Sequence, residues 1–148
     1  MKFTTLCYIE KDNKYLMLYR NKKKNDLNEG KWIGVGGKFE EKESPDECLL
    51  REVKEETGLT LTEYKLRCLV TFVSDKWETE HMYVYTATKF EGEVKECSEG
   101  TLKWIDKDKI LDLPTWEGDR LFFERMQKEK DFFTMKVEYV GDKLIKGE

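Results

Sequence analysis

A helix with clearly marked ends constrains this chain more than any other feature. Ser44 is a suitable N-cap, Pro45 suits the first helical position, and Glu47 completes a capping box with Ser44. Gly58 is the residue type that most often ends a helix. The sequence therefore predicts a helix over residues 44–57.

This helix has two chemically different faces, because successive side chains rotate by about 100° around its axis. The acidic face holds Glu52, Glu55 and Glu56, whereas the apolar face holds Leu49, Leu50 and Val53. Like charges at these spacings cost a few tenths of a kcal/mol per pair on an isolated helix, roughly, and a bound cation removes that cost. Mg²⁺ prefers such oxygen ligands. The alternative is an ordinary acidic helix face in water.

The rest of the chain predicts strands around two helices. Strands are expected over residues 4–9, 15–19, 59–73, 81–90 and 101–105, a second helix over 119–128, and a closing hairpin over 132–139 and 143–145. Residues 20–31 are expected to form an exposed loop. Because strands and helices do not alternate regularly, we expect an α+β fold with a mixed sheet covered by helices. The 148 residues, 39% of them hydrophobic, suit a single domain over 1–148.

The composition limits the classes of partner that the chain is expected to bind. The chain carries 31 acidic and 27 basic side chains, so its net charge is −4 and binding to the backbone of a DNA duplex is not expected. No apolar run approaches the roughly 20 residues of a membrane span, and residues 1–9 do not resemble a signal peptide. We expect a soluble, cytoplasmic protein. Its oligomeric state stays open.

The four cysteines are far apart and form no CxxC pair. They are Cys7, Cys48, Cys68 and Cys97. Free structural thiols are the interpretation that we favour over disulfides or a zinc site.

The spacing around the helix is more specific than the acidic face alone. Five residues separate Gly37 from Glu43, and seven more precede Arg51; the run then reads Glu52, Val53, Lys54, Glu55, Glu56, Thr57, Gly58 and Leu59. This resembles the Nudix box, G-x5-E-x7-R-E-U-x-E-E-x-G-U with U aliphatic, at every fixed position. With residue types at about 7% each, the seven fixed matches arise by chance on the order of once per 10⁸ windows.

The resemblance to Nudix hydrolases implies a fold and a set of roles. It implies an α/β/α sandwich in which Glu52, Glu55 and Glu56 bind Mg²⁺ or Mn²⁺ with help from a carbonyl of Gly36 or Gly37. Arg51 would orient the carboxylates, and Glu43 with Arg51 would brace the loop and helix. Either Glu55 or Glu56 would accept a proton from the attacking water. Glu99 stands where MutT-type members place a further metal ligand, although it also fits a surface charge.

Two further segments resemble MutT-type enzymes that hydrolyse oxidised purine triphosphates. The run Trp32, Ile33, Gly34, Val35, Gly36, Gly37 and Lys38 matches their W-x-G-x-G-G-K approach to the box. Residues 113–119 resemble the segment whose Trp stacks on the purine and whose acidic side chains bind its edge. Trp116 and Asp119 are therefore candidates for base binding, with helix-start packing as the alternative for Trp116. Mammalian members carry Asn where this chain has Ile33, so identical base recognition is not expected.

Phosphate contacts are expected from basic residues near the box. Arg20 and Lys38 are the candidates, together with the run Lys22, Lys23 and Lys24, which is equally consistent with a solvated loop. The resemblance implies Mg²⁺-dependent hydrolysis of 8-oxo-dGTP or a related purine triphosphate, as in nucleotide-pool sanitation and DNA repair. The alternatives are another pyrophosphate (an RNA 5′ end, a dinucleoside polyphosphate or a nucleotide sugar) or a nucleotide-sensing module without catalysis.

Overall fold

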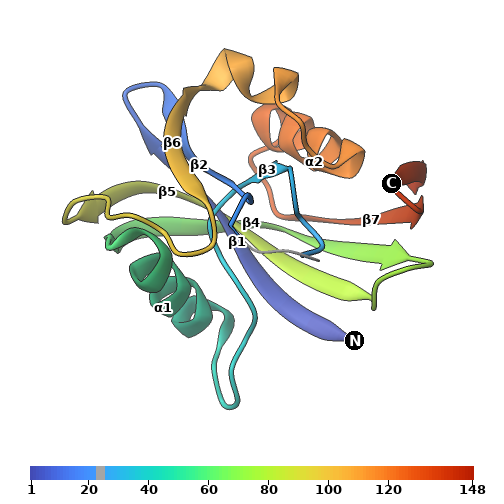
Figure 1. Cartoon of the computed structure of the whole chain (residues 1–148), viewed down its shortest axis with the longest axis horizontal. Helices are drawn as coiled ribbons and strands as arrows, with labels where there is room; N and C mark the ends of the chain where they lie inside the picture. Colours follow the sequence, from blue (N-terminus) through green and yellow to red (C-terminus); the bar gives the residue numbers. More distant parts are fainter. Residues whose placement is uncertain (23–25) are drawn as a thin grey trace.

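The computed structural model describes residues 1–22 and 26–148. Within these ranges an eight-stranded mixed sheet has the order β3-β2-β1-β5-β4-β7-β8, and β6 also pairs with β2. The strands are β1 (Lys2–Lys11), β2 (Lys14–Tyr19), β3 (Trp32–Ile33), β4 (Thr60–Ser74), β5 (Glu80–Glu91), β6 (Thr101–Asp106), β7 (Phe133–Val140) and β8 (Lys143–Gly147). β1 runs parallel to β5, and β4 runs parallel to β7. The helices α1 (Pro45–Thr57) and α2 (Glu117–Lys128) lie on opposite sides of the sheet (Figure 1).

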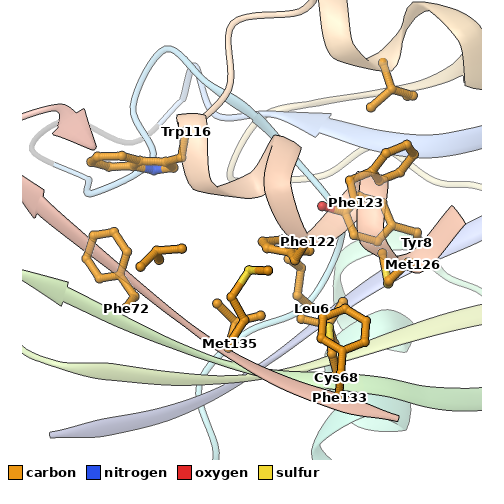
Figure 2. Packing of buried hydrophobic residues seen from close by; sticks show 14 of the residues in the cluster. Leu6, Tyr8, Cys68, Phe72, Trp116, Phe122, Phe123, Met126, Phe133 and Met135 are labelled. Atoms are coloured by element: carbon orange, nitrogen blue, oxygen red, sulfur yellow. The ribbon is translucent and has the colours of Figure 1, made fainter. Parts of the chain in front are cut away.

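The α/β/α architecture is confirmed, and alternation along the strands explains it. Side chains of successive strand residues point to opposite faces. In β1, Cys7 and Ile9 pack on the α1 side, whereas Leu6 and Tyr8 pack on the α2 side. Each face therefore has its own buried cluster, and the cluster beneath α2 is drawn in Figure 2.

The predicted caps of α1 are present. The Ser44 hydroxyl accepts from the Glu47 backbone N–H at 3.1 Å, and the Glu47 carboxylate accepts from the Ser44 N–H at 3.0 Å. Gly58 takes the left-handed conformation with φ 83° and donates to the carbonyl of Lys54. These bonds satisfy backbone groups that a helix end leaves free, so the orientation of the acidic face is fixed locally.

The segment before the box is held against β1 by close backbone contact. Val35 and Cys7 exchange two hydrogen bonds of 2.6 and 3.0 Å, and Thr5 donates to the Gly37 carbonyl at 2.9 Å. A Cβ atom on Gly36 would lie 2.0 Å from the Thr5 carbonyl oxygen. Glycine is therefore required for this approach, which brings the start of the box beside the centre of the sheet.

Several element boundaries differ from the sequence prediction; β1 begins at Lys2 and β8 ends at Gly147, each two residues beyond the predicted bound. α2 begins at Glu117, two residues before the predicted start, and the backbone N–H of Gly118 donates to the Tyr139 hydroxyl at 2.6 Å. A 3-10 helix, η1 (Lys107–Asp112), was not predicted. β5 begins at Glu80 because residues 80–87 pair in parallel with β1. The starts of α2 and β5 depend on tertiary contacts that local patterns do not report.

The cysteine prediction is confirmed, since all four residues are free and buried. In the part of the chain that the structure describes, no helix has the length and apolar character of a membrane span.

Candidate active site

The three glutamates of α1 differ sharply in exposure. Glu56 is 6% exposed, whereas the side chains of Glu52 and Glu55 are 16% and 58% exposed. The acidic face therefore runs from the protein interior to solvent, so each carboxylate has a different environment.

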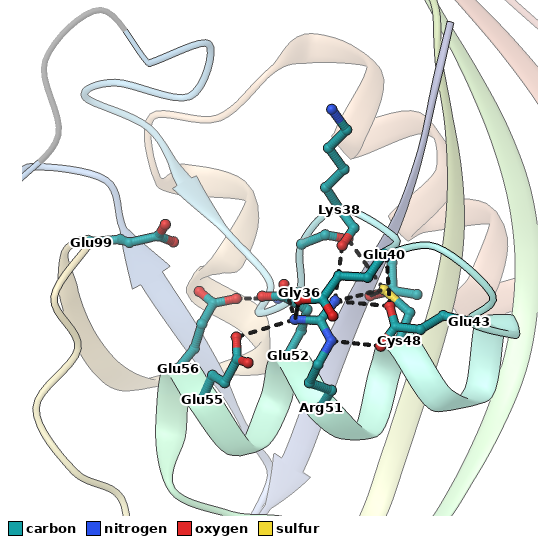
Figure 3. Close-up of polar contacts among 12 residues, drawn as sticks. Gly36, Lys38, Glu40, Glu43, Cys48, Arg51, Glu52, Glu55, Glu56 and Glu99 are labelled. Atoms are coloured by element: carbon teal, nitrogen blue, oxygen red, sulfur yellow. Dashed lines mark hydrogen bonds and ion pairs between the residues drawn. The ribbon is translucent and has the colours of Figure 1, made fainter.

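Arg51 joins the loop and the helix into one polar network (Figure 3). Its Nε and Nη2 donate to the two Glu43 carboxylate oxygens at 2.6 and 2.9 Å. Its Nη1 donates to Glu52 at 2.8 Å and to Glu55 at 3.2 Å, and Nη2 also donates to the Lys38 carbonyl at 3.0 Å. The hydrogen bond from Arg51 lowers the pKa of Glu43 to about 2. These contacts join the loop that contains Lys38 and Glu43 to α1, as expected if Glu43 and Arg51 brace the loop and the helix.

Glu56 is a buried carboxylate with one oxygen in use. Its Oε1 accepts from the Gly36 backbone N–H at 2.9 Å, whereas Oε2 has no hydrogen-bond partner among the described residues. The pKa of Glu56 is raised to about 8, mainly by burial and also by the negative charges of Glu99 and Glu52, against the lowering effect of the Gly36 hydrogen bond. An ionised carboxylate in this position needs a positive charge beside it.

Glu99 approaches from the loop before β6, on the side of α1 that carries Glu52 and Glu56 (Figure 3). Arg20, which directly follows β2, holds it there. The Arg20 Nη1 donates to Glu99 at 2.9 Å, and its Nε donates to Asp26 at 2.7 Å. Arg20 was predicted to reach substrate phosphates; it lines the cavity, and its buried guanidinium also pairs with these two carboxylates.

The donor set suits a hard divalent cation, although its side chains are not gathered around one point. In the described part of the chain, no group of three His, Cys, Asp or Glu side chains is arranged as a metal-binding set; Glu52 and Glu55 are both paired with Arg51. A bound cation would satisfy the Glu56 Oε2, which has no hydrogen-bond partner among the described residues. Gly37 also fits this use, because a Cβ there would lie 2.4 Å from the Glu52 carboxylate. Carboxylate oxygens are the ligands that Mg²⁺ and Mn²⁺ prefer.

A cavity of about 360 Å³ is bordered by Glu52 and Glu99, whereas Glu55 and Glu56 are not among its described lining residues. Its volume is in the range of small-molecule sites. It is lined by Lys2, Thr4, Thr5, Leu6, Arg20, Asp26, Leu27, Asn28, Ile33, Gly36, Gly37, Lys38, Glu52, Phe72, Glu80, Met82, Glu99, Trp116 and Asp119. One cavity thus brings the box together with the segment that was predicted to bind the base.

Trp116 forms part of the apolar wall and is also a packing residue. It is 4% exposed, its Nε1 donates to the Asn28 side chain at 2.9 Å, and its ring contacts Phe72 and Tyr139 edge-on. The Lys31 ammonium lies 4.3 Å from the ring centroid. Both interpretations of Trp116, base-site wall and packing, therefore agree with its surroundings.

Of the other residues predicted to bind substrate, only some border the cavity. Lys38 lines the cavity, but Trp32 is absent from the described residues around it and instead packs on Tyr19 with ring centroids 5.1 Å apart. The Lys22 ammonium donates to the Cys97 carbonyl at 2.9 Å. Lys23 and Lys24 lie outside the described residues.

Several lining residues were missed by sequence reasoning. They are Lys2, Thr4, Phe72, Glu80 and Met82. The parallel pairing of β1 with β5 places Lys2 opposite Glu80 and Thr4 opposite Met82. No local motif marks these positions, because the pairing joins segments almost eighty residues apart.

The protein therefore has a three-layer α/β/α fold in which the acidic helix α1 borders a cavity large enough for a small molecule. The family model described as the NUDIX domain matches residues 2–126. YvcI, an uncharacterised Nudix hydrolase of Bacillus subtilis, is 33% identical over 84% of this chain and 78% of its own length. The oxidized purine nucleoside triphosphate hydrolase of Danio rerio is 32% identical over 88% of this chain and 83% of its own. The chain belongs to the Nudix hydrolase family.

A solved structure supports the same assignment over the whole chain. The crystal structure of a mutator MutT protein from Bacillus halodurans superposes with a TM-score of 0.88 and 28% identity, covering 100% of this chain and 97% of that one. Hydrolases of this family generally require a divalent metal, which agrees with the donor set described above.

Asp119 lies in the first turn of α2 and borders the cavity. Its carboxyl group makes no hydrogen bond to any residue that the structure describes. The pKa of Asp119 is raised from 3.8 to about 7, mainly by burial and also by the negative charge of Glu80, while Lys31 opposes the change. The folded protein therefore binds this proton more tightly than the unfolded chain does.

This difference predicts how the Asp119→Asn variant changes stability with pH. The wild-type protein loses stability as Asp119 ionises, progressively from about pH 4 to about pH 7. Across this range, the free energy of unfolding of the wild type should fall relative to that of the variant by up to about 4 kcal/mol. Urea unfolding at several pH values measures the difference. Asp112→Asn, at an exposed position, should follow the wild type, and parallel wild-type and Asp119→Asn curves would contradict the expectation.

Proposed function

We propose that this protein hydrolyses purine nucleoside triphosphates to the monophosphate and pyrophosphate with Mg²⁺ or Mn²⁺, and that 8-oxo-dGTP or a related oxidised purine is its preferred substrate. One observation carries the proposal: a single cavity joins the carboxylates Glu52 and Glu99 to the pocket residues Trp116 and Asp119. Such a cavity suits a molecule with phosphates at one end and a base at the other. Similarity to the Danio rerio oxidized purine nucleoside triphosphate hydrolase and to the Bacillus halodurans MutT protein supports the same substrate class.

The metal ligands in this proposal are Glu52, Glu55, Glu56 and Glu99, with a backbone carbonyl at Gly37. Bound Mg²⁺ or Mn²⁺ supplies neutralisation of phosphate charge and an acidified water. Glu55 is exposed and paired only with Arg51 among the described residues, so its side chain is free to turn toward the cavity. The Gly37 carbonyl accepts from Thr5 and from the Cys48 thiol, which fixes its position.

The chain's own residues would position water and phosphate. Of the two candidate proton acceptors, Glu56 is favoured because one of its oxygens has no partner among the described residues and because its pKa is raised. Arg51 and Glu43 would hold the loop and α1 in register. Lys38 and Arg20, which both line the cavity, would contact the phosphates, and Arg20 would also hold Glu99 in place.

Base binding is proposed for Trp116 and Asp119. A Trp face supplies stacking worth about 1 to 3 kcal/mol per base, and the Asp119 carboxyl is free to bind a base edge. Ile33 lines the cavity where mammalian members carry Asn, so this chain offers an apolar contact in place of an amide. Its base recognition would therefore rely more on the acidic side chains.

We also propose that residues 1–148 act as one domain in the cytoplasm. The family match ends at residue 126, but β7 continues the same sheet by pairing with β4, and β8 pairs with β7. Four free thiols agree with a reducing compartment.

The Glu56→Gln variant tests the proton acceptor. Because one oxygen of Glu56 is buried without a partner among the described residues, we expect thermal stability that equals or exceeds that of the wild type, while kcat falls by about 10² to 10⁴. Differential scanning calorimetry and pyrophosphate release measure the two effects. The exposed Glu41→Gln change is the matched control, and a Glu56→Gln enzyme with normal turnover would remove Glu56 from the chemistry.

The Trp116→Ala variant tests the base site. Loss of stacking should raise KM for purine triphosphates by about 5- to 100-fold, with a smaller effect on inorganic triphosphate. Because Trp116 also packs against Phe72 and Tyr139, the milder Trp116→Phe change accompanies it. Trp104→Phe, on the opposite face of the sheet, controls for loss of a Trp. Equal effects on all substrates would exclude Trp116 from the base site.

The function itself is tested by pyrophosphate release with Mg²⁺ on a substrate panel. The panel contains 8-oxo-dGTP, the normal nucleoside triphosphates, dinucleoside polyphosphates, nucleotide sugars and triphosphorylated RNA. The highest kcat/KM is expected for 8-oxo-dGTP. Preference for another pyrophosphate would retain the Nudix chemistry and discard the purine assignment, and binding without hydrolysis throughout would indicate a sensing module.

A further inference from the structure

The cavity contains a carboxylate that the proposed chemistry does not use. Glu80 is the first residue of β5, lines the cavity and has a side chain only 11% exposed. The Thr4 hydroxyl donates to its Oε2 at 2.7 Å, and the Lys2 ammonium lies 3.5 Å from its Oε1. Both partners belong to β1, so the parallel pairing of β1 with β5 fixes this carboxylate at the cavity wall.

These partners leave Glu80 with unused acceptor capacity. An ionised carboxylate offers about four lone-pair positions, whereas Glu80 receives one short hydrogen bond and one longer ion pair from the described residues. A carboxylate that is largely withdrawn from water costs free energy unless donors satisfy it. The remaining positions therefore suit N–H donors from a bound molecule.

Asp119 faces the same part of the cavity from α2. Both carboxyl groups line the cavity, and Asp119 lies in the same helix turn as Trp116, whose ring packs on Phe72, the β4 residue paired with Glu80. Phe72, Met82 and Trp116 line the cavity around the two carboxyl groups. This end of the cavity therefore combines a flat apolar lining with two acidic groups.

A guanine-type edge fits these groups better than an adenine-type edge does. Guanine carries a ring N–H beside an exocyclic amino group, so adjacent atoms donate to a carboxylate. Adenine places an acceptor nitrogen beside its amino group, and a carboxylate repels that acceptor. We propose that Glu80 is a specificity-determining residue that binds the N–H edge of a guanine-type base and selects it over adenine-type bases; this rests on the proposed function.

The competing explanation is that Glu80 only joins β1 to β5 through Thr4 and Lys2. The Glu80→Gln change separates the two roles. Its side-chain oxygen still accepts from Thr4, but the amide places an N–H₂ group where the base edge needs an acceptor. A structural role predicts altered stability with unchanged base preference, whereas a recognition role predicts altered preference.

The test compares 8-oxo-dGTP with 8-oxo-dATP, which share the oxidised five-membered ring and differ at the six-membered ring. For Glu80→Gln we expect the ratio of kcat/KM values, guanine over adenine, to fall by about 10- to 100-fold. Glu78→Gln, an exposed carboxylate that pairs with the N-terminus, is the matched control and should keep the wild-type ratio.

A binding measurement keeps the inference separate from catalysis. Calorimetric titration with 8-oxo-dGMP should show a similar loss of affinity in Glu80→Gln, and also in Glu80→Asp, which keeps the charge but withdraws it by one methylene. Unchanged ratio and affinity in folded variants that still hydrolyse purine triphosphates would overturn the role of Glu80 and leave the proposed function standing. A wild-type enzyme inactive on all purine triphosphates would overturn both.

Discussion

The site depends on the Arg51 guanidinium more than on any other group. It is the point where Glu43, the Lys38 carbonyl, Glu52 and Glu55 meet. Without this charge, the acidic face of α1 would carry uncompensated repulsion and the preceding loop would lose its tie to the helix. Arg51 therefore offsets the repulsion among these carboxylates and ties Glu52 and Glu55 to the loop that precedes the helix.

The second constraint is the close approach of the glycine segment to β1. Gly36 admits the Thr5 carbonyl and donates its N–H to Glu56, and Gly37 leaves space for the Glu52 carboxylate. The same strand continues to Thr4 and Lys2, which hold Glu80 at the other end of the cavity. β1 is therefore shared by the proposed metal end and the proposed base end, so both are built on one central strand of the sheet.

Local chemistry explains what could be predicted from the sequence. The caps at Ser44 and Gly58 and the spacing of the box involve residues near one another in the chain, so the helix, its acidic face and the family follow from the pattern alone. The cavity does not, because its far wall depends on pairing between β1 and β5. Glu80 and the Arg20–Glu99 contact join segments more than seventy residues apart, and no periodicity encodes them. Roles of the site residues remain predictions that the variants above address.

The central claim is that this cavity directs water to a phosphoanhydride bond so that pyrophosphate leaves as one unit. Phosphorus NMR of 8-oxo-dGTP incubated with the wild-type protein and Mg²⁺ tests it most directly, because it identifies which bond is cut. We expect equal amounts of nucleoside monophosphate and pyrophosphate, and no product after chelation of the metal. Nucleoside diphosphate with orthophosphate, or an intact triphosphate in the presence of Mg²⁺, would contradict it.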